Sequence, residues 1–166
     1  SGRQVLSANS REIGSIRRVV TGQTADGKSV FTHIEEVEPW QSGHIANHGV
    51  WGWDVLPKLP FNSPEPFVPT SVFPGANPGA TRVNVVVFPP GQGVEKREPM
   101  ETSAEYQQLL AAVPAGGSMD PATRMHSTDS IDIAFVLDGE IGLEQEDGTE
   151  VTLRRGDTLV QNGARH

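Results

Sequence analysis

The sequence predicts an all-β fold, and three observations lead to that prediction. The chain of 166 residues holds 18 glycines and 13 prolines, which interrupt helices and favour many turns between short strands. Only one stretch has helical periodicity, whereas residues 130–161 divide into short apolar runs separated by Asp-Gly and Gly-Asp pairs. Apolar residues make up 36% of the chain before glycine is counted, which is enough for the core of one domain.

A β-hairpin is the first predicted element. Residues 17–21 and 28–36 are rich in β-branched side chains and flank Asp26 and Gly27, a dipeptide that favours tight hairpin turns. We therefore expect two antiparallel strands joined at this turn.

The middle of the chain mixes irregular segments with one strand. Residues 43–53 contain too much glycine to predict an element. Residues 57–78 contain seven prolines, and because proline fixes φ and lacks an amide donor, we expect an extended arm there. Residues 82–88 are rich in valine and end at Pro89-Pro90-Gly91, as a buried strand does.

One short helix is predicted at residues 102–113. Thr102 and Glu105 have the spacing of a capping box, and apolar side chains recur at helical intervals before Pro114 ends the pattern. These side chains are Tyr106, Leu109, Leu110 and Val113.

The C-terminal part has the clearest strand pattern. Four short segments alternate with turn signals and are too closely spaced for crossover helices, so we expect a β-meander. The predicted strands are 130–137, 140–145, 150–154 and 158–161. Each should pair antiparallel with the next, and Asp138-Gly139 should form the two-residue turn between the first two.

The composition excludes several classes of function. A net charge of −8 disfavours binding to nucleic acid or to an anionic membrane surface. The absence of cysteine excludes disulfides, thiolate metal sites and cysteine nucleophiles. No apolar run is longer than residues 133–137, which are far fewer than a membrane span needs, and the first 30 residues lack a signal-peptide stretch. We therefore expect a cytoplasmic protein.

A first motif near the C-terminus resembles that of the cupin superfamily. Cupins have His-x-His, three or four residues, Glu, six residues and Gly. The matching residues here, at the same spacing, are His126, Thr128, Asp132 and Gly139.

A second motif continues the resemblance. Cupins have Gly-Asp, a short strand, Pro-x-Gly, two residues and His. This chain has Gly156-Asp157, then Gln161-Asn162-Gly163, then two residues and His166. Glutamine stands where proline is usual, and the match covers residues 116–166.

The resemblance implies a fold and an assembly. The fold is a single cupin jelly-roll barrel (double-stranded β-helix), here with an N-terminal extension and one short helix. Residues 81–166 would form the barrel, and residues 1–80 would supply N-terminal strands and the proline-rich arm packed on it, within one structural domain. Cupins commonly dimerise through a barrel face, and the apolar side chains of the arm need a surface, so we expect a homodimer.

The resemblance also implies a metal site. In metal-binding cupins, the two histidines and the glutamate of the first motif and the histidine of the second motif hold the ion. Their counterparts His126, Asp132 and His166 keep imidazole or carboxylate ligands, which suit a divalent Zn, Fe, Mn or Ni. Thr128 has only a hydroxyl, and with Arg124, on the same face of an extended segment, it is a candidate for substrate binding. A metal-free cavity in which these polar groups bond to one another is the open alternative.

Two functional hypotheses follow. The first is an enzyme in which a divalent metal held by His126, Asp132 and His166 polarises a small oxygenated or carboxylate-bearing metabolite, as cupins do in decarboxylation, isomerisation or dioxygen chemistry. The second is a metal-free barrel that binds a small-molecule ligand without turnover. The metal content of the purified protein separates them.

Two further features complete the sequence-based expectations. His44 and His48 stand four apart, as ligands on a helix do, but Gly43 and Gly49 argue against a helix. We interpret the two histidines as loop residues in solvent or in a lid. The second motif reaches only His166, and an open sheet edge beside a buried site would leave amides unpaired. We therefore expect further residues after it, the alternative being that the N-terminal strands close the sheet.

Overall fold

The structure is a computed structural model that describes residues 14–42, 45–60, 77–90, 118–120 and 125–166. Within these residues the chain forms eleven strands and no helix, which confirms the all-β prediction for the described part. The helix predicted at 102–113 lies outside the described residues.

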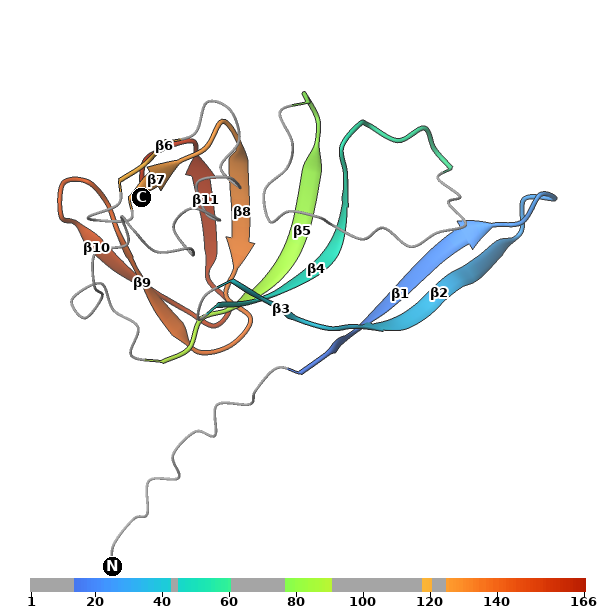
Figure 1. The fold of residues 1–166 in the computed structure, drawn as a ribbon, viewed down its shortest axis with the longest axis horizontal. Coiled ribbons are helices and arrows are strands. Elements are labelled where there is room, and N and C mark those ends of the chain that lie inside the picture. The colour runs from blue at the N-terminus through green and yellow to red at the C-terminus, as the bar shows by residue number, and fades with distance from the viewer. Residues whose placement is uncertain (1–13, 43–44, 61–76, 91–117, 121–124) are drawn as a thin grey trace, which may run out of the picture.

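The N-terminal hairpin forms as predicted. β1 (Ile16–Gln23) and β2 (Ser29–Val37) pair antiparallel along their whole length. Gly27 has a φ of 83° in the turn, a conformation that glycine adopts without strain, and its N–H donates to the Thr24 carbonyl at 2.9 Å. In Figure 1 this hairpin extends away from the other strands.

Three strands form the next sheet, in the order β3 (Trp40–Ser42), β4 (Ile45–Trp53) and β5 (Thr81–Val87). β5 confirms the strand predicted at 82–88. β4 occupies a segment for which we predicted no element, because its glycines are compatible with a strand that carries a bulge. Most of the predicted arm at 57–78 lies outside the described residues.

One buried cation joins the hairpin to β4. The Arg18 Nη1 donates to the carbonyl oxygens of Val50 at 2.9 Å and Gly49 at 3.5 Å. Its Nη2 forms an ion pair with Glu35 Oε1 at 3.0 Å. The bulge lies between Gly49 and Trp51 and leaves Val50 outside the β4–β5 register, which makes its carbonyl available to the guanidinium.

The four C-terminal strands form where predicted but pair differently. They are β8 (Ile131–Phe135), β9 (Glu140–Glu144), β10 (Glu150–Arg154) and β11 (Thr158–Asn162). β9 pairs antiparallel with β10, and β8 pairs antiparallel with β11. The predicted meander is therefore wrong. β8 and β11, the strands before and after the β9–β10 hairpin, pair with each other instead of with their sequence neighbours.

Asp138-Gly139 is a corner and not the predicted hairpin turn. The Arg155 N–H donates to the Gly139 carbonyl at 3.1 Å and the Gly156 N–H donates to the Val136 carbonyl at 2.9 Å. The two strand pairs therefore continue as one ribbon that bends here. The dipeptide favours a positive φ, 72° at Gly139, but it does not determine which strand pairs next.

The β9–β10 half of the ribbon separates apolar from charged side chains. Ile141 lies opposite Leu153, and Leu143 lies opposite Val151, so these four share one face. The other face carries Glu140, Glu144, Glu150 and Arg154. The apolar face is the one available for a core.

Two short strands, β6 (Ser118–Met119) and β7 (His126–Ser127), also pair antiparallel. The described strands thus form five small sheets, none of which closes on itself. No helix long and apolar enough to cross a membrane occurs in the described segments.

Candidate functional site

The structure brings His126 and His166 together. The backbone N–H of His126 donates to the His166 carbonyl at 2.8 Å, and the reverse bond is 3.0 Å long. The two ring centroids are 4.4 Å apart with an angle of 56° between the planes. The His166 Nδ1 lies 2.9 Å from the Ala164 carbonyl; because a carbonyl only accepts, we infer that Nδ1 carries the proton and that Nε2 is the lone-pair nitrogen of the neutral ring.

Beside β7, three alternating side chains form a hydrogen-bonded row. The hydroxyls of Thr128 and Ser130 are 2.8 Å apart, and Ser130 donates to Asp132 Oδ1 at 2.9 Å. Thr128 is only 4% exposed. An ionised carboxylate only accepts hydrogen bonds, so the Ser130 hydroxyl donates to Asp132. The Thr128 hydroxyl must therefore donate to Ser130.

Gln161 adds a polar group on the other strand. It lies opposite Asp132 in the β8–β11 register, so the two side chains share a face of the sheet. Its Nε2 is buried and has no hydrogen-bond partner in the described part of the chain. A buried donor without a partner is costly, and a bound molecule would satisfy it.

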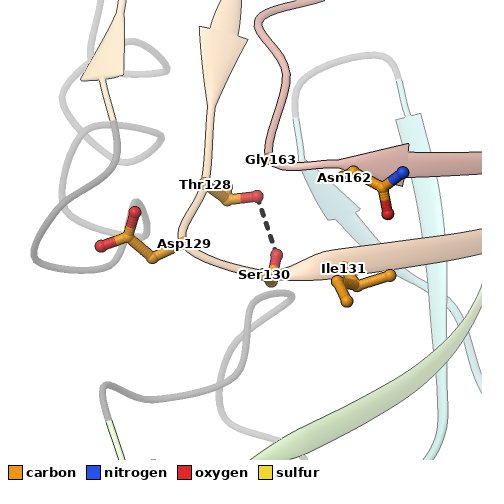
Figure 2. Close-up of a pocket in the computed structure, with 6 residues that line it drawn as sticks. All are labelled: Thr128, Asp129, Ser130, Ile131, Asn162 and Gly163. Carbon is orange, nitrogen blue, oxygen red and sulfur yellow. Dashed lines mark hydrogen bonds between the residues drawn. The ribbon is translucent and has the colours of Figure 1, made fainter.

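An open pocket of about 400 Å³ lies at the start of β8, beside Ile131. Figure 2 shows its lining residues, with the Thr128–Ser130 hydrogen bond between Asp129 on one side and Ile131 and Asn162 on the other. Gly163 completes the lining. The volume is that of a site for a small molecule.

The predicted metal ligands do not assemble as a set of three. No group of three His, Asp or Glu side chains that could hold a metal occurs among the described residues. His126 and His166 meet, whereas Asp132 Oδ1 accepts a hydrogen bond from the Ser130 hydroxyl. Among the described residues the predicted ligands therefore form no three-ligand site, and we derive no chemistry through one.

The remaining predicted site residues lie elsewhere. Arg124 and His44 are outside the described residues. His48 is fully buried on β4, with Nε2 at 2.7 Å from the Gly14 carbonyl and Nδ1 at 3.4 Å from the Val85 carbonyl. Its interpretation as a solvated loop or lid residue is wrong, because the bulged strand places its ring among backbone acceptors.

Sequence reasoning missed Ser130 and Gln161. The signal for Ser130 was its alternation with Thr128 and Asp132, which puts the three on one side of an extended segment. Gln161 was visible only as the residue replacing the usual proline of the second motif. Neither signal shows which strand would bring Gln161 to Asp132.

Two curated proteins are similar to this chain over most of its length. They are phomopsin biosynthesis cluster protein D and phomopsin biosynthesis cluster protein C′ of Diaporthe leptostromiformis. Each is 31% identical over 160 residues, which covers 95% of this chain and 71% of the relative. No protein-family model matches the sequence.

Proposed function

This chain belongs to the family of phomopsin biosynthesis cluster proteins D and C′, and we propose on that premise that it is a cupin-type jelly-roll barrel protein that binds a small metabolite. The binding site comprises His126, Thr128, Asp132 and His166. The names of both relatives refer to a biosynthesis cluster, which supports a metabolite as the ligand.

The nested strand pairing supports the barrel. In a double-sheet jelly roll, strands that pair in one sheet continue into strands that pair in the other. The ribbon of this chain bends at Gly139 and Gly156 and so passes from the β9–β10 pair to the β8–β11 pair. A meander would not have this property.

The observation that carries the binding proposal is the meeting of His126 and His166. These residues stand in separate motifs, and the site around them offers both kinds of hydrogen-bonding group. The Gln161 amide supplies a donor, whereas the His166 Nε2 lone pair and the Asp132 carboxylate supply acceptors. This arrangement orients a small polar molecule without a covalent step.

A metal-dependent enzyme of decarboxylase, isomerase or dioxygenase type is the second candidate. The two adjacent imidazoles favour it, since imidazole is a common ligand for divalent Zn, Fe, Mn and Ni. Catalytic zinc sites, for comparison, have three protein ligands. The described residues gather only two, so we place the binding protein first.

NMR spectroscopy of the histidine rings tests the binding proposal. Purified protein is titrated with a fragment library of small carboxylates, alcohols and amines. We expect fragments to shift the ring signals of His126 and His166 together, and His126→Phe to abolish the response of His166. His33→Phe, on β2, is the matched control and should leave it intact. Binding that leaves both site histidines unshifted would contradict the assignment.

We also propose a homodimer. The hairpin exposes Val19, Phe31 and Ile34 at 47%, 68% and 57%, although it packs on β4 through Arg18. The residues just before and at the start of the predicted arm expose apolar side chains: Val55, Leu56 and Leu59, at 70%, 68% and 77%. A second copy would cover both sets of apolar side chains.

A further inference from the structure

One face of β8 is apolar and exposed. Ile131, Ile133 and Phe135 alternate along the strand and so share a face, with exposed fractions of 70%, 63% and 65%. Val160 of β11 lies opposite Ile133 and is 52% exposed. We call these four residues the β8 strip.

The β8 strip runs into the pocket of Figure 2. Ile131 belongs to both, and Asn162, which lines the pocket, lies opposite Ile131 in the register. An apolar surface that ends in a polar pocket suits a molecule with an apolar body and a polar head.

The pocket presents hydrogen-bond acceptors. The protons of the Thr128 and Ser130 hydroxyls are both used within the row that ends at Asp132, so these oxygens have only lone pairs left. The backbone carbonyls of the same two residues face Gly163, at 3.2 and 3.8 Å from the position of an added Cβ. These acceptors favour a head group that donates hydrogen bonds, and the Asn162 side-chain oxygen can also accept one.

The negative charge at the pocket also favours a head group that donates hydrogen bonds. The Asp129 carboxylate lines the pocket and is exposed, and no ion pair joins it to any other described residue. The chain as a whole carries a net charge of −8. A carboxylate or phosphate head would be repelled here, whereas an ammonium group would be attracted.

We propose that the pocket binds the primary ammonium group of a small molecule whose apolar body lies on the β8 strip. The inference rests on the proposed function, because Thr128 belongs to both sites, and it adds the chemical class of the ligand. The ammonium group pairs with the Asp129 carboxylate and donates to the backbone carbonyl oxygens of Thr128 and Ser130.

Simple amines test this assignment. The full chain is titrated with n-butylamine, n-hexylamine and hexanoate, and backbone amide shifts are followed by NMR. We expect both amines to shift residues 128–133 and 162–163, with affinity rising about two- to fourfold per added methylene, as burial of a CH₂ group gives. Hexanoate should not bind. Tighter binding of hexanoate than of hexylamine would overturn the proposal.

A charge variant locates the head group. Asp129→Asn removes the carboxylate at an exposed position and should weaken hexylamine binding about fivefold, the effect of losing a partly solvated ion pair of about 1 kcal/mol. Asp138→Asn, exposed at the corner of the ribbon, is the matched control and should change nothing. Equal effects of the two variants would mean a general charge effect and would overturn the site.

Other outcomes separate this inference from the proposed function. If amines fail but another fragment shifts His126 and His166, the ligand class is wrong and the binding function stands. If no fragment binds and Ile133→Asp converts a dimer into a monomer, the β8 strip is an interface between copies and this proposal fails. Binding of a lysine-containing peptide but not of hexylamine would likewise contradict a small-molecule ligand.

Discussion

Ser130 is the middle residue of the Thr128–Ser130–Asp132 row, and its loss should destabilise the protein. Ser130→Ala leaves the hydroxyl of Thr128, which is 4% exposed, without its partner at 2.8 Å. An unsatisfied buried polar group costs about 1–3 kcal/mol. Urea denaturation should therefore show a lower free energy of unfolding by about that amount. Ser130→Thr keeps the hydroxyl and should lose less of the free energy of unfolding. Equal losses in the two variants would show that the hydrogen-bonded row does not contribute to stability.

Thr128→His restores the imidazole that the cupin motif has at this position. If the wild-type chain takes up Zn²⁺ or Ni²⁺ through His126 and His166, a third imidazole should tighten binding, measured by calorimetry at pH 7.5. Protonated imidazole cannot ligate, so affinity should fall as the pH is lowered. An unchanged affinity in a protein that does bind metal would remove the metal candidate.

At the residue scale, the motif spacing was enough to expect that His126 and His166 meet. The two residues lie at opposite ends of the C-terminal strands, and the ribbon brings those ends together. The partner of Asp132 could not be predicted, because a hydrogen bond to Ser130 depends on a rotamer and not on spacing. His48 was misjudged because nothing local reveals that Gly14 and β5 lie against its ring.

At the scale of single elements, Arg18 holds the hairpin on the bulge of β4. Arg18→Met removes its bonds to the Val50 carbonyl and to Glu35. We expect a destabilisation of about 2 kcal/mol and faster hydrogen exchange in β1 and β2. Arg17→Met, at the exposed neighbouring position, is the control. Equal exchange in both variants would show that the guanidinium does not anchor the hairpin.

Gly139 tests the corner of the ribbon. It has a φ of 72°, Gly148 of the β9–β10 hairpin has a φ of 78°, and a Cβ at either position would meet nothing within 4 Å. Valine at either position should therefore cost about 1–2 kcal/mol through backbone strain alone. Asparagine tolerates this conformation and should cost less. A thermal midpoint unchanged by Gly139→Val would contradict the corner.

The Asp-Gly dipeptide shows how far local sequence predicts an element. It closes hairpins at Asp26-Gly27 and Asp147-Gly148, but at Asp138-Gly139 it bends a ribbon. All three glycines have positive φ, so the backbone conformation was predictable. The pairing was not, because it depends on contacts between strands that are distant in sequence, such as β8 and β11.

At the scale of the whole molecule, the all-β class was predictable because it follows from composition and short apolar runs. Whether the strands close into a barrel was not predictable, since that depends on how separate sheets approach each other. The described strands form five small sheets, and the nested ribbon is the feature that supports a jelly roll. A sequence pattern with period two describes each strand equally well in a meander and in a jelly roll.

The assembly is the last prediction. We expect a sedimentation mass of about twice 17.9 kDa at micromolar concentration, because a second copy buries the apolar side chains of the hairpin and of residues 55–59. Phe31→Asp and Leu59→Asp place charges at positions that are 68% and 77% exposed in the single chain. Each should therefore produce monomers while leaving the fold intact.

Ile133→Asp is the matched control for this assembly, because Ile133 is 63% exposed but belongs to the β8 strip that we assign to ligand. It should leave the dimer unchanged and weaken hexylamine binding. The hairpin and arm variants thus test whether one apolar surface binds a second copy, and Ile133→Asp tests whether the β8 strip binds the ligand. A wild-type mass of about 18 kDa would refute the homodimer, and dissociation caused by Ile133→Asp alone would move the interface to β8.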